Sequence, residues 1–179
     1  GVLSYAPGLY APTGLTSFSY KVADASGVFS NIAAITVQVA AKAPIANDDA
    51  GYVAPGDSVA IDLLANDQSY GGGPIDPATV TLLGAPVEAS VNANGVLTFA
   101  PGPLAPTGPV AFQYTVIDAS GNVSNAAAVT VQVTALPPIA NADSGTVVVG
   151  QTLVLDLLAN DVSFGGGPLD PTSVVLSGA

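Results

Sequence analysis

The chain repeats itself at an offset of 94 residues. Positions 1–85 align with positions 95–179 without a gap, and 51 of the 85 aligned pairs are identical. Asp-Leu-Leu-Ala-Asn-Asp at 62–67, for example, returns unchanged at 156–161. A period of this length indicates tandem structural units, so the fold of one unit constrains the fold of the whole chain.

The joints between units are expected in two Ala- and Pro-rich stretches, 40–44 and 134–138, because proline stiffens linkers. This division predicts three segments. They are the C-terminal half of one repeat (1–41), a complete repeat (45–135) and the N-terminal half of a further repeat (139–179). Since both ends fall inside repeats, we expect the sequence to be a window of a longer array.

Apolar and polar residues alternate within each repeat, which is typical of half-buried strands. The predicted strands of the complete repeat are 52–53, 59–64, 79–83, 87–91, 96–99, 112–117 and 129–133. Clusters of Gly, Pro, Asn and Asp separate them as turns. About seven short strands in one repeat match an immunoglobulin-like sandwich, so the sequence predicts an all-β fold of tandem Ig-like β-sandwiches.

The composition excludes several classes of function. The chain has no Cys, His, Met or Trp, which rules out disulfides, Cys/His zinc sites and His-based catalytic triads. The formal net charge is −11, and Lys21 and Lys42 cannot form a basic patch for nucleic acid. No apolar run is long enough for a membrane span. No nucleophile–base pair can be named, so we expect no enzymatic activity.

Acidic residues are the candidate ligands of a metal ion. In an Ig-like fold the segments 47–49, 66–76 and 118–122 are expected to meet at one end of the sandwich. Carboxylate, amide and backbone oxygens there would suit Ca²⁺. The candidate ligands are Asp24, Asn47, Asp49, Asp67, Asp76, Asp118, Asp143, Asp161 and Asp170. The alternative is turn chemistry, in which Asp and Asn side chains bond nearby backbone amides.

Tyr20 and Tyr114 occupy equivalent positions in the predicted sixth strand of their repeats. Ig-like domains can carry a tyrosine corner near this strand, in which the hydroxyl bonds the backbone a few residues upstream. Simple packing in the core is the alternative for both residues.

Five motifs follow one another in the complete repeat and recur in the flanking segments. They are Ala-Asn-Asp-Asp (46–49), Ile-Asp-Leu-Leu-Ala-Asn-Asp (61–67), Asn-Gly-Val-Leu-Thr-Phe-Ala-Pro (94–101), Phe-Gln-Tyr-Thr-Val-Ile-Asp (112–118) and Ala-Val-Thr-Val-Gln-Val (128–133). This ordered set resembles the bacterial Ig-like/cadherin-like tandem repeats of large secreted adhesins of the RTX and VCBS-repeat kind. The resemblance implies cadherin-like sandwiches, a place at the bacterial cell surface or outside the cell, and calcium between domains.

We therefore expect an extracellular structural repeat that forms an adhesin stalk or a head-to-tail surface filament with a mechanical role. Its expected partners are copies of itself, because 1–41 and 139–179 have open strand edges that are templates for pairing. One alternative is a glycan- or protein-binding module, for which Tyr70 and Phe164 are the only aromatic residues in a candidate loop. Another is an accessory domain of a carbohydrate-active enzyme.

Overall fold

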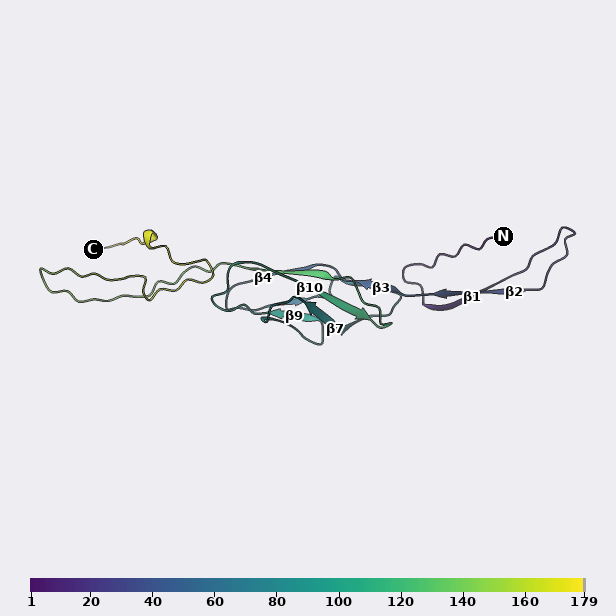
Figure 1. Ribbon diagram of the computed structural model, residues 1–179, viewed down its shortest axis with the longest axis horizontal. Coiled ribbons are helices and arrows are strands. Elements are labelled where there is room, and N and C mark those ends of the chain that lie inside the picture. Colours follow the sequence, from purple (N-terminus) through teal and green to yellow (C-terminus); the bar gives the residue numbers. More distant parts are fainter. Residues whose placement is uncertain (179) are drawn as a thin grey trace.

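The computed structural model describes residues 1–178 and contains strands and one short 3₁₀-helix. The strands confirm the predicted all-β fold. The molecule extends along one long axis, with a sandwich in the middle, residues 1–41 at one end and the C-terminal residues at the other (Figure 1). Among the described residues, no helix has the length and apolar character to cross a membrane.

The larger sheet of the sandwich contains four strands. Their order is β4 (Asp49–Val53), β11 (Ala127–Val133), β10 (Gly108–Asp118) and β7 (Ile75–Leu83). β10 is antiparallel to β11 and β7, whereas β11 is parallel to β4. The two central strands come from the second half of the repeat and the two outer strands from the first half. Neither half can therefore form this sheet alone.

The smaller sheet contains β5 (Val59–Asp62), β9 (Val96–Phe99) and β8 (Ala89–Val91), in that order and antiparallel. A further antiparallel pair joins β3 (Lys42–Ile45) to β6 (Gln68–Tyr70). The sequence does not predict β3 or β6. The stretch expected to be a linker is thus a strand in this region, and Pro44 is fully buried in it.

Apolar side chains between the two sheets form the core. Val129, Val131 and Val133 of β11 point inward and are fully buried, as the alternation of the sequence predicts. The core residues are Ala46, Val53, Leu63, Val80, Leu97, Phe99, Phe112, Tyr114, Val116, Ala127, Val129, Val131 and Val133. All of them lie within the complete repeat, which is therefore the unit that buries a core.

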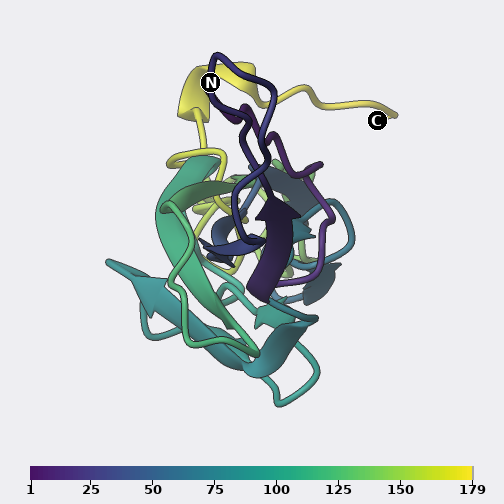
Figure 2. The ribbon, with the colours of Figure 1, turned by 90° about the vertical axis from the view of Figure 1, so that its right-hand side faces the viewer.

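We call residues 1–41 the back segment and residues 139–178 the front segment. The back segment contains the antiparallel hairpin of β1 (Gly14–Tyr20) and β2 (Ala33–Val39), the counterpart of β10 and β11. Along the long axis this hairpin lies in line with the sandwich (Figure 2). In the front segment, the described residues form one isolated bridge, Ile139 with Val162, and the 3₁₀-helix η1 (Pro171–Ser173).

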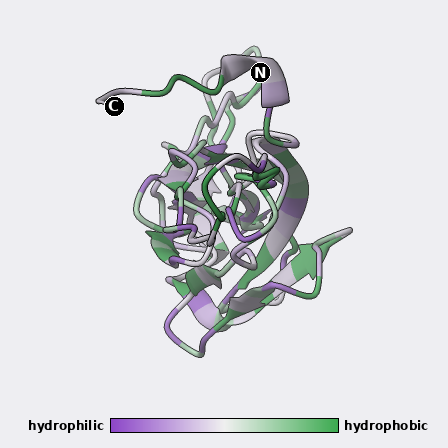
Figure 3. Ribbon diagram, turned by 90° about the vertical axis from the view of Figure 1, so that its left-hand side faces the viewer, coloured by the Kyte–Doolittle hydropathy of each residue, from purple (hydrophilic) through white to green (hydrophobic). Residues whose placement is uncertain are grey.

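The front segment leaves apolar side chains in solvent. Its C-terminal stretch is coloured hydrophobic in Figure 3. Val175 and Leu176 in this stretch are 87% and 82% exposed. A folded chain normally covers such side chains, so this surface has the character of a contact.

Candidate functional site

Tyr114 of β10 joins three segments at one end of the sandwich. Its side chain is fully buried, and its hydroxyl lies 2.9 and 3.0 Å from the carboxylate oxygens of Asp67. The carbonyl oxygens of Leu63 and Asn47 lie 2.7 and 3.1 Å from the same hydroxyl. These partners are 47 to 67 positions upstream. Tyr114 is therefore a core residue with a polar anchor, and its bonds do not have the short span of a tyrosine corner.

Two carboxylates share this region with Tyr114. Asp49 Oδ1 accepts a hydrogen bond from the Asn66 amide at 3.3 Å, while Asp49 Oδ2 is buried without a partner among the described residues. Burial, together with the negative charges of Asp67 and Asp48, raises the pKa of Asp49 to about 6. Burial also raises the pKa of the Asp67 carboxyl. The cluster therefore favours a protonated carboxyl in mildly acidic solution.

Asp118 is the last residue of β10, at the start of a separate turn, and is 3% exposed. The backbone amides of Ser120 and Asn122 each donate to its Oδ1 at 2.9 Å, and the Asn122 side chain donates as well. Burial opposes the charge, but these hydrogen bonds outweigh it and hold the pKa of Asp118 below its ordinary value. A Cβ at Gly72 would come within 1.8 Å of Asp118 Oδ2, so the loop around Gly72 packs directly on this carboxylate.

Three further candidate ligands accept a hydrogen bond from the backbone amide two positions ahead. The pairs are Asp24 with Ser26, Asp76 with Ala78 and Asp170 with Thr172. Side-chain hydrogen bonds from Ser26 and Thr172, followed by backbone bonds, lower the pKa values of Asp24 and Asp170. These contacts are Asx turns, the alternative that the sequence left open.

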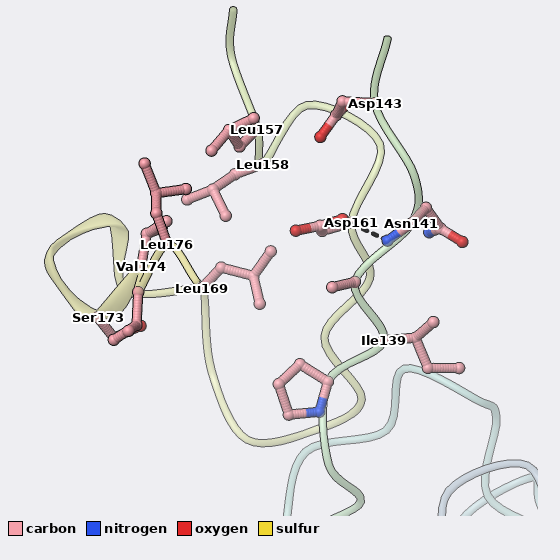
Figure 4. A pocket seen from close by; sticks show the side chains of 13 residues that line it. Ile139, Asn141, Asp143, Leu157, Leu158, Asp161, Leu169, Ser173, Val174 and Leu176 are labelled. Atoms are coloured by element: carbon pink, nitrogen blue, oxygen red, sulfur yellow. Dashed lines mark hydrogen bonds between the residues drawn. The ribbon is translucent and has the colours of Figure 1, made fainter. Parts of the chain in front are cut away.

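The remaining candidates, Asp143 and Asp161, lie in the front segment. The Asn141 backbone amide donates to Asp161 Oδ1 at 2.7 Å, and the Asn141 side chain donates to the Asn160 carbonyl at 2.7 Å. Both bonds repeat those of Asn47 in the complete repeat. Figure 4 shows Asn141, Asp143 and Asp161 beside an open cavity, which Leu157 and other apolar residues also line. The volume of this cavity is about 360 Å³.

The candidate calcium ligands thus occupy several places. Segment 66–76 contacts each of the other two segments separately: the Asn47 amide donates to Asp67, and the Ala119 amide donates to the Pro74 carbonyl at 3.0 Å. Of the residues that the structure describes, however, no three His, Cys, Asp or Glu side chains are grouped so that they could hold a metal ion. Calcium binding remains a prediction from the sequence, and Asn47, Asp49 and Asp67 are the candidates that lie together.

The back segment packs on the complete repeat through contacts that the sequence does not predict. The rings of Tyr10 and Tyr70 stack with centroids 5.8 Å apart, and Lys42 Nζ lies 4.6 Å from the Tyr70 ring centroid. A Cβ at Gly71 would lie 3.2 Å from the Ala11 carbonyl oxygen. These contacts bury Tyr70 almost completely.

The glycine contact of this joint recurs between the complete repeat and the front segment, whereas Leu104 and Phe164 stand in place of the stacked Tyr10 and Tyr70. Gly165 faces the Ala105 carbonyl and the Thr107 side chain, as Gly71 faces Ala11 and Thr13. The Thr107 amide also donates to the Gly165 carbonyl at 3.3 Å. Ala-Pro-Thr-Gly and Gly-Gly-Gly-Pro, which build the joint, are identical in both copies of the sequence. The identity of these two motifs in both copies is the feature of the sequence from which a repeated contact could have been predicted.

The two packed sheets and their strand order define an Ig-like β-sandwich. A sequence profile of the bacterial Ig domain matches residues 41–134, and the chain belongs to this family. No curated protein sequence matches the chain. Among solved structures, it is similar to the sialic acid binding region of a Streptococcus sanguinis SK1 adhesin bound to 3'sLn. The identity is 14%, the TM-score is 0.40, and the match covers 73% of this chain and 47% of that one, about half its length.

Proposed function

We propose that the chain is a structural module of a bacterial protein that acts outside the cell, in which Ig domains follow one another head to tail. The array serves as an adhesin stalk or a surface filament, and its work is spacing and cohesion. The observation that carries this proposal is the recurrence of one backbone contact at both ends of the complete repeat, Gly71 with Ala11 and Gly165 with Ala105. Such a contact 94 residues apart is expected of units that stack with a set geometry, and not of units on free linkers.

The path of the chain through the first joint supports a stiff array. Residues 42–45 enter the complete repeat as strand β3, which pairs with β6. Tyr70 at the end of β6 stacks on Tyr10 of the preceding unit. The connecting residues are therefore held to the complete repeat by the pairing of β3 with β6, and the preceding unit is held to β6 by the stacked tyrosine rings. Such a joint resists bending more than a solvated linker does.

The position of Tyr70 favours this role over recognition of a glycan by exposed aromatic side chains. Tyr70 belongs to the loop region that a ligand would meet, yet it is 8% exposed and covered by the preceding unit. The paired carboxylates do not favour catalysis either, since Asp67 is engaged by Tyr114 and the Asn47 amide. The partners we propose are copies of the same unit, within one polypeptide or between chains.

Small-angle X-ray scattering of the dilute chain tests the proposal. A compact protein of this length would have a radius of gyration of about 16 Å. We expect a clearly larger value and the scattering profile of a rod. Tyr70→Ala should loosen the first joint and broaden the distribution of end-to-end distances, while Tyr52→Ala on an exposed site of β4 should leave it unchanged. A compact particle, or equal profiles for both variants, would contradict a stiff array.

A further inference from the structure

The first and the last strand of the larger sheet lie side by side in the complete repeat. β4 follows the segment through which the chain enters the repeat, and β11 precedes the point where the chain leaves it. We propose that this pair makes the repeat a load-bearing unit, in which the Asn125 side chain holds the entering segment to the segment that leads into β11. This inference deepens the cohesive function proposed above and rests on it, because tension reaches the repeat through its neighbours.

The directions of the two strands decide how tension acts on their hydrogen bonds. β4 and β11 are parallel, and their register runs without a shift from Asp49 with Val129 to Val53 with Val133. The neighbouring units lie at opposite ends of the long axis (Figure 1), so tension pulls β4 toward its N-terminal end and β11 toward its C-terminal end. The strands are thus loaded in opposite directions along their length, and all the bonds of the ladder bear the load together. A pull across the strands would open these bonds one after another.

Asn125 extends the ladder beyond the N-terminal end of β4. The Ala46 amide donates to Asn125 Oδ1 at 3.1 Å, and Asn125 Nδ2 donates to the Ala46 carbonyl at 2.8 Å. The side chain therefore pairs with Ala46 as the backbone of a neighbouring strand would. Ala46 is 3% exposed, so water has little access to replace these bonds. We call the two bonds the Asn125 lock, and it lies where tension enters the repeat.

Two further contacts join the entering and leaving segments, one at each end of the ladder. The Ala128 amide donates to Asp48 Oδ1 at 2.7 Å, one position before β4 begins. The Thr134 amide donates to the Val53 carbonyl at 2.9 Å, one position after β11 ends. Hydrogen bonds therefore connect the two segments beyond the bounds of the paired strands. A longer ladder under lengthwise load needs more bonds to break at once.

The residues of the Asn125 lock recur in the sequence. Pro-Ile-Ala-Asn at 44–47 is identical to the motif at 138–141, and Asn31 stands 94 positions before Asn125. The same pair of Asn and Ala can therefore form in successive units. Units that lie in series all bear the same tension, so a lock is of use only where each of them has one.

Asn92 makes a comparable set of bonds away from the path of the tension. Its Oδ1 accepts hydrogen bonds from the amides of Asn94 and Val96 at 2.9 and 3.1 Å, in the turn between β8 and β9. Asn92 thus makes two bonds to the backbone, as the Asn125 lock does. Neither β8 nor β9 carries the chain into or out of the repeat. Asn92 should therefore contribute to stability without contributing to resistance against tension.

Force-clamp spectroscopy of the full chain, held at its two ends, tests the proposal. At a constant force the complete repeat should unfold at least about tenfold faster in Asn125→Ala than in the unaltered chain, because two bonds are lost from the loaded ladder. Asn92→Ala is the matched control and should unfold at the rate of the unaltered chain, because its turn is still intact when the ladder breaks. The released length, about 3.5 Å per residue, identifies the unfolding of the complete repeat. Urea denaturation should show a similar loss of stability in both variants.

The direction of pulling tests the ladder while Asn125 stays in place. The chain has no cysteine, so Ala54→Cys together with Thr134→Cys provides two attachment points at one end of the ladder. Pulling between them separates β4 from β11 across the strands. At the same force the repeat should open at least about tenfold faster than when it is held at its ends, since one hydrogen bond opens at a time.

Two results would overturn the inference. If Asn125→Ala unfolds under force no faster than Asn92→Ala, the Asn125 lock does not bear the load. If pulling between positions 54 and 134 opens the repeat no faster than pulling at the two ends, the ladder is not loaded along its length. Both results leave the stiff array unaffected, because scattering of the dilute chain tests it separately. A compact particle in scattering would instead contradict the proposed function and leave both force comparisons unchanged.

Discussion

Gly72 occupies a position where a single methyl group has no room. A Cβ there would come within 1.8 Å of Asp118 Oδ2, and backbone hydrogen bonds hold that carboxylate in place. We expect Gly72→Ala to lower the free energy of unfolding by about 2 kcal/mol, as for overpacking of a core. Urea denaturation measures this. Gly166→Ala is the matched control at the equivalent position, where a Cβ meets open space. Equal effects of the two substitutions would contradict the argument.

Asp49 makes the free energy of unfolding of the complete repeat depend on pH, and its pKa shift sets the direction of this dependence. Its pKa of about 6 in the folded chain is above the ordinary value of 3.8, so the folded state binds more protons between these pH values. The free energy of unfolding should therefore fall as the pH rises from 4 to 6. Asp118, whose pKa is lowered, acts in the other direction and only below about pH 4.

Asp49→Asn isolates this contribution. The variant should have a shallower loss of stability between pH 4 and pH 6, and it should be more stable than the unaltered chain at pH 7. Urea denaturation at several pH values measures both effects. Asp57→Asn, which replaces an exposed carboxylate away from Tyr114, should keep the original pH profile. A profile that Asp49→Asn leaves unchanged would show that Asp49 ionises as it does in the unfolded chain.

The calcium prediction concerns the same residues. A divalent cation near Asp49 and Asp67 would offset the repulsion of their charges and stabilise the folded state through linkage. The sequence therefore predicts that the thermal midpoint rises in calcium and falls back with a chelator, and that Asp49→Asn removes the rise. A midpoint that is the same with calcium and with chelator would exclude a calcium site that affects stability.

Strands with a clear alternation could be predicted from the sequence. β11 contains the alternating Val residues of the predicted strand 129–133. β10 contains the predicted strand 112–117 and extends beyond it at both ends. β3 and β6 could not be predicted, since each is short and β3 contains a proline. Pro44 is tolerated in this strand because Lys42 and Ile45 are the residues of β3 that pair with β6, and Pro44 is not paired. That pairing depends on a contact between distant segments, which local alternation does not contain.

For the candidate site, as for the strands, the sequence identifies residues but not their distant contacts. The recurrence of Asp67 and Asp118 in the neighbouring copies marks them as candidates, and in the structure both accept several hydrogen bonds. Which partner each would find was not predictable, because the Tyr114 hydroxyl and Asp67 are 47 positions apart. The Asp118 carboxylate accepts hydrogen bonds from amides of its own turn, whereas the Asp67 carboxylate accepts one from Tyr114, on a strand of the other half of the repeat. Sequence patterns alone do not distinguish these two kinds of hydrogen-bond partner.

The strands at the first joint determine the expected pattern of proteolysis. The Ala- and Pro-rich stretch 40–44 is protected, because 42–45 pairs with β6 and Pro44 is buried. We expect elastase, which cleaves after small apolar residues, to cut first within 139–178, where the described backbone makes few hydrogen bonds. Mass spectrometry of early fragments identifies the sites. First cuts inside 52–133 would contradict the assignment of the core to that part.

At the scale of the molecule, one unit has its core and its two neighbours have only parts of one. The complete repeat supplies both sheets and all the core residues. The flanking segments meet it through equivalent backbone contacts, Gly71 with Ala11 on one side and Gly165 with Ala105 on the other. The stiff array that we propose therefore depends on these contacts between units, and the stability of the unit depends on its own core.

Hydrogen exchange can compare the stability of the complete repeat with that of its neighbours. In dilute solution the amides of β10 and β11 should exchange slowly, since they belong to a four-stranded sheet around a buried core. Amides of the front segment should exchange quickly, because isolated bonds such as those between Ile139 and Val162 open easily.

The contrast follows from the place of the core, because all the core residues lie in the complete repeat. Mass spectrometry of peptides from the exchanged chain measures it, with β10 as the internal reference. Protection of the front segment equal to that of β10 would contradict the assignment of the stable core to the complete repeat.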